Sequence, residues 1–315
     1  MTKFARPSAG LAAKLVALLS ATPAQAQNNK TFVSSTGSAG GPCTRAAPCI
    51  SFSFAHDATV PEGEINCLDS GPFGGATITK SITIDCAGTT TNQFIINAAG
   101  IVVRLRNLTF NGLLLPITTG ISIDFVNGAA VFVENCVIAN NDGSLPQIGI
   151  RFQPTAPGSQ LVVTDTVLSN NGSGTSGGGI LVKPASGVTA QVTLNRVTAA
   201  KNSHGIIADG TGGGSIRGAV RDSVVSANAN NGITVTTAGS GSAVLAVENT
   251  TVTGNNFGLV SGGASSGMLV GQSSIVLNNT GLFPTGGGAL LSYKNNNVNG
   301  NTTADGTFTG VIGQQ

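Results

Sequence analysis

Polar and apolar residues follow a frame that returns along most of the chain. Each copy opens with Asn, Asp or Gln, carries an apolar residue or Thr three positions later, and usually has Asn after three more. The copies are Asn135/Ile138/Asn141, Asp165/Leu168/Asn171, Asn195/Thr198/Lys201, Asp222/Val225/Asn228, Asn249/Val252/Asn255, Gln272/Ile275/Asn278 and Asn295/Val298/Asn301, with a partial copy at Asn107/Phe110. Their starts lie 23 to 30 residues apart, which is the period of a solenoid.

Each repeat also contains three strand signals. One is centred on the frame, one leads into the next frame, and one opens with Gly and an aliphatic residue. The glycine-led starts are Gly120-Ile121, Gly149-Ile150, Gly179-Ile180, Gly205-Ile206, Gly232-Ile233, Gly258-Leu259 and Gly281-Leu282. Three short β-rich segments per repeat, with Gly, Asn and Ser turns and no amphipathic helix between them, predict an all-β parallel β-helix with three sheets.

The frame also predicts which side chains stack in the core. Residues two before the frame start form one inward column: Leu105, Val133, Val163, Thr193, Val220, Val247, Val270 and Tyr293. The aliphatic residues after the glycines form another, from Ile121 and Ile150 to Leu282. We expect the Asn that closes each frame to form a turn and to hydrogen-bond the next copy's amide, because Asn tolerates left-handed backbone geometry.

A column one residue away from the inward one is expected to point outward. It contains Arg104, Phe132, Val162, Val192, Ala219, Ala246, Leu269 and Ser292. A contiguous apolar stripe on the outside indicates a covered surface. Three covers remain open: another protein, a second copy of this chain in a homo-oligomer, or the chain's own loops.

The start of the chain differs from the repeats. Residues 1–26 combine basic residues with the short apolar run Leu15 to Leu19 and end at Ala24-Gln25-Ala26, which predicts a secretory signal peptide too short to span a bilayer. Residues 27–64 are expected to hold a strand, a cysteine loop and a helix over Ile50 to Thr59 that caps the core. Residues 65–315 are the predicted β-helix.

Five cysteines follow the predicted cleavage site, and an exported chain permits disulfides. Cys43 and Cys49 flank a five-residue loop, so a bridge is the expected state. Cys67 and Cys86 occupy equivalent places on adjacent turns about 4.8 Å apart, where either a disulfide or a stack of two buried thiols fits. Cys136 has no predicted partner and is expected to pack inside the core. No metal site or cofactor is expected, because neither His lies near a Cys at ligand spacing.

The charge balance changes little of this picture. Cleavage would remove three of the fifteen basic residues and none of the thirteen acids, leaving 12 − 13, a net charge near −1. We therefore expect no nucleic-acid partner. No later segment is long and apolar enough to span a membrane, so the predicted location is secreted, periplasmic or cell-surface.

Taken together, the signal peptide, the cysteine loop with its capping helix, and the stacked Asn and aliphatic columns resemble the right-handed parallel β-helix, pectin-lyase-like superfamily of exported bacterial proteins. The resemblance covers nearly all of the chain after residue 26. It implies a three-sheet coil and an acidic polysaccharide as the substrate class where such proteins are enzymes. It does not fix the chemistry, because one fold carries many functions.

Charge on the glycine-led strand of each repeat marks the candidate site. Asp124, Arg151, Gln153, Lys183 and Asp209 are expected to form an outward strip that binds a glycan, with all but Arg151 in one column. Acids three turns apart would be about 14 Å apart, beyond the roughly 5 to 9.5 Å of glycosidase pairs.

Two further sets of residues are candidates for catalysis. His204, in Ser203-His204-Gly205, is similar to the Gly-His-Gly element of galacturonases but lacks its partner motifs. Asp165 and Asp222 lie two turns apart, near 9.6 Å, and are interpreted as turn residues.

Two functions follow. The first is a non-enzymatic exported scaffold that is surface-associated, adhesive or glycan-binding. The alternative is a divergent polysaccharide lyase or glycoside hydrolase acting on an acidic polysaccharide through Arg151, Lys183, His204 and Asp209.

Overall fold

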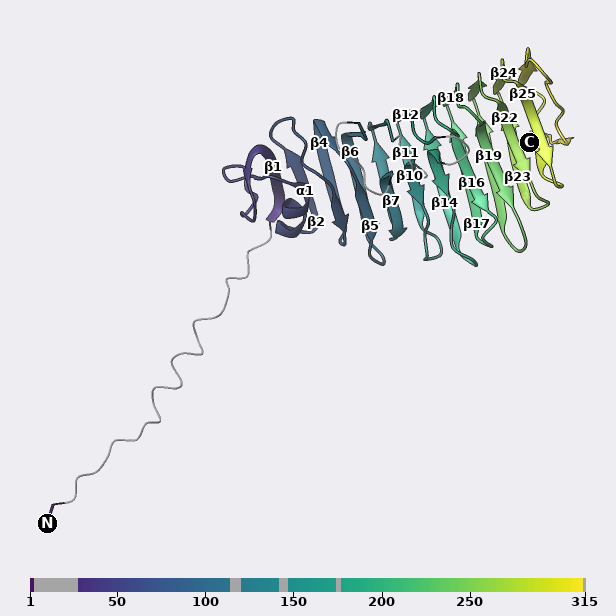
Figure 1. The fold of residues 1–315 in the computed structure, drawn as a ribbon. Helices are drawn as coiled ribbons and strands as arrows, with labels where there is room; N and C mark the ends of the chain where they lie inside the picture. The colour runs from purple at the N-terminus through teal and green to yellow at the C-terminus, as the bar shows by residue number, and fades with distance from the viewer. Residues whose placement is uncertain (3–27, 114–119, 142–146, 174–176, 314–315) are drawn as a thin grey trace.

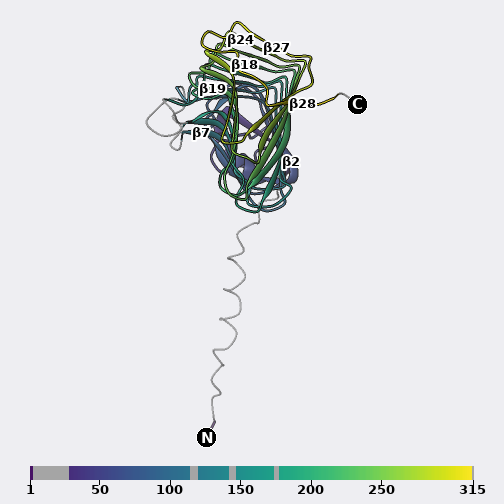
Figure 2. The same cartoon turned by 90° about the vertical axis from the view of Figure 1, so that its right-hand side faces the viewer.

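The computed structural model describes residues 1–2, 28–113, 120–141, 147–173 and 177–313. Over these ranges the chain is a parallel β-helix whose coils follow one another from the N-terminal to the C-terminal end (Figure 1). In the view turned by 90°, the coils lie one behind another and overlap (Figure 2). The predicted signal peptide lies outside the described residues, apart from its first two.

In the described part of the chain, nine strands form one sheet in chain order. They are β3 (Ala76–Ile78), β5 (Phe94–Asn97), β7 (Ile121–Asn127), β10 (Ile148–Phe152), β13 (Gly178–Val182), β16 (Ile206–Gly210), β19 (Asn231–Thr237), β22 (Phe257–Gly262) and β25 (Thr280–Thr285). Every pairing between neighbours is parallel.

The other strands form two faces of one long bent sheet. One face contains β1 (Asn28–Ser38), β2 (Thr59–Cys67), β4 (Ile82–Thr91), β6 (Val102–Asn111), β8 (Ala130–Glu134), β11 (Gln160–Thr164), β14 (Thr189–Asn195), β17 (Ser215–Arg221), β20 (Ser242–Glu248), β23 (Ser266–Gly271), β26 (Ala289–Ser292) and β28 (Gly310–Val311). The second face contains β9 (Val137–Ala139), β12 (Val167–Ser169), β15 (Thr198–Ala200), β18 (Val224–Ser226), β21 (Thr251–Thr253), β24 (Ser274–Val276) and β27 (Asn297–Asn299).

These faces are the other two of the three predicted sheets. They are joined because β6 pairs with both β8 and β9.

Stacked aliphatic side chains fill the core as predicted. Ile150, Ile180, Ile206 and Ile233 are successive Cα partners and are fully or almost fully buried. The first member was predicted wrongly, since Ile123 and not Ile121 lies against Ile150. Ile121 pairs with Ile148, two residues earlier. The cause is that Gly120 and Gly149 do not occupy equivalent positions in their coils.

Two copies of the repeat frame are also shifted by one residue. In the column that begins with Leu105 and Val133, Leu194 and Ser292 occupy the predicted places of Thr193 and Tyr293. Left-handed backbone at the frame start marks the same shift, because it falls on Arg196 and Lys294 and not on the neighbouring Asn195 and Asn295. Ala199 likewise replaces Thr198 in the core. The strand alternation of Ala190, Val192 and Leu194 sets this register.

The closing Asn residues form a ladder that contacts the next coil as expected. The left-handed backbone expected at these residues falls instead on the residue before each of them, for example Asn140 and Leu277. Each backbone N–H donates to the side-chain oxygen of the next Asn at 2.9 to 3.4 Å. From the second member on, each Nδ2 also donates to a backbone carbonyl of the preceding coil at 3.0 to 3.1 Å. The ladder runs through Asn141, Asn171, Asn202, Asn228, Asn255, Asn278 and Asn301. Lys201, predicted for the third place, is exposed in the turn beside it.

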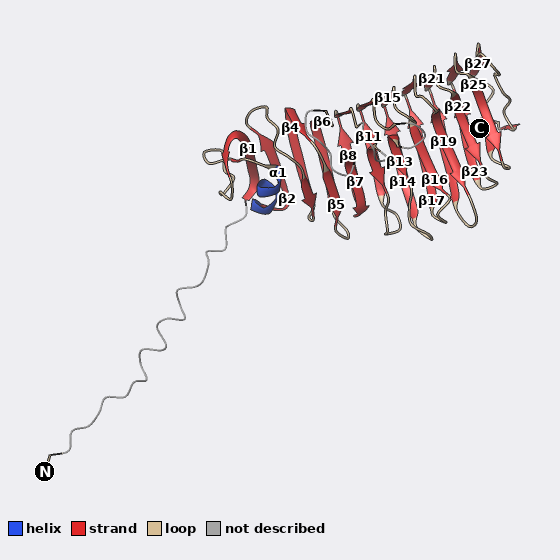
Figure 3. Ribbon diagram, viewed as in Figure 1, coloured by secondary structure: helices blue, strands red, loops and turns tan. Residues whose placement is uncertain are grey.

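A single helix in the described residues, α1 (Phe52–Ala58), caps the N-terminal end of the core (Figure 3). Phe52, Ala55 and Ala58 are buried, whereas Phe54 and the preceding Ile50 are exposed. The helix starts later than expected, with Ser51 as its N-cap. Phe52 then meets the core aromatic ring of Phe94 at a centroid distance of 5.3 Å.

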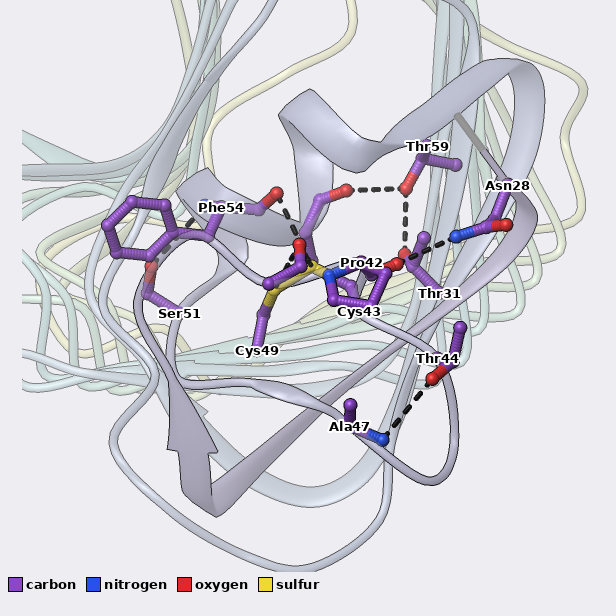
Figure 4. The surroundings of a disulfide bond; sticks show 12 residues. Asn28, Thr31, Pro42, Cys43, Thr44, Ala47, Cys49, Ser51, Phe54 and Thr59 are labelled. Carbon is purple, nitrogen blue, oxygen red and sulfur yellow. Dashed lines mark hydrogen bonds between the residues drawn. A yellow bond between two sulfur atoms is a disulfide. The ribbon is translucent and has the colours of Figure 1, made fainter. Parts of the chain in front are cut away.

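Both predicted cystine pairs are disulfides. Cys43 and Cys49 close the loop that packs against the helix, with Cα atoms 4.7 Å apart (Figure 4). Cys67 and Cys86 join adjacent coils with Cα atoms 5.0 Å apart, which decides between the two alternatives left open above. Cys136 is a free thiol in the core, and burial raises its pKa to about 12.

Candidate functional site

The predicted polar strip lies on the outer face of the nine-stranded sheet, but its charges are arranged in two separate ion pairs. Asp124 on β7 is the Cα partner of Arg151 on β10. The Arg151 guanidinium donates to both carboxylate oxygens, from Nε at 2.8 Å and from Nη2 at 2.6 Å. Such a bidentate contact fixes both side chains. Asp124 is buried beneath it, with 5% of its surface exposed.

The second pair lies on the next two coils. Lys183, which follows β13, contacts Asp209 on β16 with Nζ 2.8 Å from Oδ2. Thr211 donates to the other oxygen of Asp209 from its backbone N–H at 2.9 Å and from its hydroxyl. Burial raises the pKa of Asp209, but the hydrogen bonds from Lys183 and Thr211 outweigh it and hold this pKa below its ordinary value.

The predicted single column of Asp124, Gln153, Lys183 and Asp209 is therefore wrong in one member. Gln153 and Lys183 do stand at one level, since each follows directly on the partnered residues Phe152 and Val182. Asp124 lies at the level of Arg151 instead. The two-residue shift of Gly120 described above causes this difference.

His204 lies away from both ion pairs. It is half-buried at the corner before β16, where its carbonyl accepts a hydrogen bond from the N–H of Gly179. Asp209 lies five residues further along, about 16 Å away at the rise of a β-strand. The following Gly205 has a packing role: a Cβ there would lie 2.5 Å from the carbonyl oxygen of Gly232. The Ser-His-Gly sequence thus reflects the close approach of two coils.

Asp165 and Asp222 are turn residues with basic or amide partners. Arg196, on the coil between them, donates to both oxygens of Asp165 at 2.6 and 2.8 Å. This hydrogen bonding lowers the pKa of Asp165. Asp222 accepts from Nδ2 of Asn249 at 2.6 Å. The role of Arg196 was missed because the frame was placed one residue early, although the alternation through Leu194 signals it.

The outward apolar stripe lies on the long sheet, with two corrections. The stripe consists of residues that are Cα partners from one coil to the next: Arg104, Phe132, Val162, Thr193, Ala219, Ala246, Leu269 and Leu291. Val192 and Ser292, predicted to belong to it, point inward and are buried. The same one-residue shift that moved Leu194 and Ser292 into the core explains both.

Ion pairs flank the stripe. Arg106 contacts Glu134 at 2.6 Å and Arg221 contacts Glu248 at 3.1 Å. Among the described residues, no group of three or more His, Cys, Asp and Glu is placed to hold a metal ion. Over the same residues, no helix has the length and apolar character needed to cross a membrane.

Comparisons with known proteins give one structural likeness. No protein family matches the chain, and no curated protein matches it. The crystal structure of pectate lyase Pel9A aligns with a TM-score of 0.45 and 13% identity, over 85% of this chain and 69% of that one. The assignment as a parallel β-helix rests on the strand register described above.

Proposed function

We propose that this chain is a non-enzymatic scaffold, acting outside the cytoplasm, that binds a polysaccharide along the outer face of its nine-stranded sheet. The observation that carries the proposal is the polar strip, whose charged side chains are held in place by the ion pairs Asp124–Arg151 and Lys183–Asp209. The two disulfides fit an oxidising compartment.

The strip is suited to binding because its polar groups are held in place before a ligand arrives. Arg151 and Lys183 have 30% and 40% of their side chains exposed while remaining ion-paired. Each retains N–H donors beyond those used on its carboxylate. When a sugar hydroxyl accepts a hydrogen bond from such a donor, little conformational entropy is lost, because the side chain is already ordered. Gln153 adds an amide at the level of Lys183.

The same geometry weighs against acid–base chemistry. A glycosidase acid needs a carboxyl with a raised pKa, whereas the pKa of Asp209 is lowered. Asp124 is held bidentately by Arg151. The coils that carry the two acids are three apart, about 14 Å. The alternative of a lyase or hydrolase at Arg151, Lys183, His204 and Asp209 therefore becomes the competing outcome of the test.

The test is a glycan array followed by affinity electrophoresis of the purified protein in gels that contain the best polysaccharide. We expect retarded migration that is weakened about fivefold in Lys183→Ala and in Gln153→Ala, the loss of roughly one hydrogen bond. Lys201→Ala removes an exposed Lys on another face and should migrate as the wild type does. Circular dichroism melting shows that each variant is folded.

Two results would overturn the proposal. One is equal retardation of the Lys183→Ala, Gln153→Ala and wild-type proteins. The other is cleavage of pectate, alginate or another uronan well above a heat-inactivated control, with loss of that cleavage in Arg151→Ala. The latter would establish the enzymatic alternative.

A further inference from the structure

A second surface, on the long sheet and separate from the strip, has the features of a small-ligand site. A depression of about 520 Å³ lies over β6, β8 and β11, with Val102, Arg104, Phe132 and Gln160 in its lining. A second depression of about 350 Å³ adjoins it and shares Val102 and Arg104. Volumes of this size are typical of ligand sites, which are mostly apolar with a few polar groups.

Arg104 is the charged group common to both depressions. Its guanidinium carbon lies 3.9 Å from the centroid of the Phe132 ring, a cation–π contact that holds the planar group in place. The two residues are Cα partners on β6 and β8, so backbone pairing fixes their relation. The guanidinium is thus presented on an aromatic support.

The nearest carboxylate leaves Arg104 incompletely matched. Glu134 accepts from Nε of Arg106 at 2.6 Å, while its other oxygen lies 3.6 Å from Nη1 of Arg104. At that distance Arg104 and Glu134 form an ion pair but not a hydrogen bond. Arg104 is 38% exposed, and its fork of N–H donors matches the two oxygens of a carboxylate.

We infer that this depression is a binding site for a carboxylate carried on a ring with an apolar face. The carboxylate would be held by the Arg104 fork, and the ring would lie on the surface formed by Val102, Ala130 and Phe132. An aromatic acid and a uronic acid share this chemistry. The inference goes beyond the proposed function, because the site lies on a different sheet from the strip.

Isothermal titration of the purified protein tests the inference with benzoate and glucuronate, each against its neutral counterpart, benzamide or glucose. We expect saturable binding of at least one carboxylate, and about tenfold weaker binding of its counterpart because the charge-assisted hydrogen bonds are lost. Arg104→Gln and Arg104→Lys should both weaken binding about tenfold, since Lys lacks the planar fork. Arg217→Gln removes an exposed Arg from the same sheet, outside the depression, and should bind as the wild type does.

Which carboxylate binds identifies the source of the ligand. The inference is overturned if neither carboxylate binds saturably, if the neutral counterparts bind equally well, or if Arg104→Gln binds as the wild type does. Gel retardation at the strip is expected to persist in Arg104→Gln, so the two proposals fail separately.

Discussion

Two sets of polar side chains run along this solenoid, the buried Asn ladder and the partly exposed polar strip on the nine-stranded sheet, and they are built differently. In the Asn ladder, each interior amide both accepts from one neighbour and donates to another, and the column continues from Asn141 to Asn301. On the nine-stranded sheet, the polar residues instead close into two pairs of opposite charge. Burial requires every donor and acceptor to find a partner, whereas exposure leaves some of them to solvent or to a ligand.

The end of the ladder lies near the surface, and its last amide still has an acceptor. At the last coil, Oδ1 of Asp305 accepts from both the backbone N–H and Nδ2 of Asn301. A carboxylate supplies the acceptor that the next Asn would have provided, but an ionised carboxylate has no donor with which to continue the column. The comparison therefore separates residues that define the fold from residues available for binding.

The largest effect is expected from removing one ladder amide. Asn255→Ala removes the side-chain oxygen that accepts from the backbone N–H and the Nδ2 of Asn228, and the Nδ2 that donates to the carbonyl of Val225, all of them buried. This loss should lower the free energy of unfolding by about 2 to 4 kcal/mol. Asn256→Ala is the matched control, because its side chain accepts one bond, from Asn279, and about 0.5 kcal/mol is expected. Urea unfolding measures both. Equal losses would remove the distinction between the buried ladder and the polar side chains beside it.

A somewhat smaller effect is expected at Gly205, where two coils approach closely. In Gly205→Ala, the new methyl would lie 2.5 Å from the oxygen of Gly232 and 2.6 Å from a methyl of Val225, which should cost about 1 to 3 kcal/mol. A Cβ at Gly212 meets nothing within 4 Å, so Gly212→Ala should leave the melting temperature unchanged or slightly raised. A harmless Gly205→Ala would contradict the coil spacing.

The smallest effect concerns pH and the capping helix. His56 is buried, and its Nε2 accepts from the backbone N–H of Thr79 at 3.2 Å. Burial is the largest influence and lowers its pKa below the ordinary 6.5, while the adjacent Asp57 opposes and Lys80 adds to this shift.

The unfolded chain therefore takes up the proton first as pH falls. The contribution of His56 to stability is complete above pH 6.5 and is lost progressively below it. The melting temperature of the wild type should fall between pH 7 and pH 5 by more than that of His56→Gln, which keeps a neutral acceptor. Parallel curves for the two proteins would contradict this assignment.

The sequence predicted the parts of the molecule that repetition controls. Ile150, Ile180, Ile206 and Ile233 stack as expected because a shared period forces equivalent residues to one level. Asp124 and Lys201 were misplaced because each lies in a coil whose length differs by one or two residues from its neighbours. In such coils the alternation of buried and exposed residues along the strand sets the register, and counting residues from the previous repeat gives the wrong position. Arg151 was expected in the strip, but its bidentate contact with Asp124 required the true register. The depression at Arg104 and Phe132 depends on loop shape, which the frame does not encode.

Native-state hydrogen exchange tests the central claim, that a buried Asn ladder ties the coils together, most directly. The backbone N–H groups of Asn171, Asn202, Asn228 and Asn255 donate to side-chain oxygens of the next coil. We predict that these turn amides exchange as slowly as those of the core strands, near the free energy of global unfolding. Exchange as fast as that of the exposed turn at Gly212 would contradict the ladder and the stacking that depends on it.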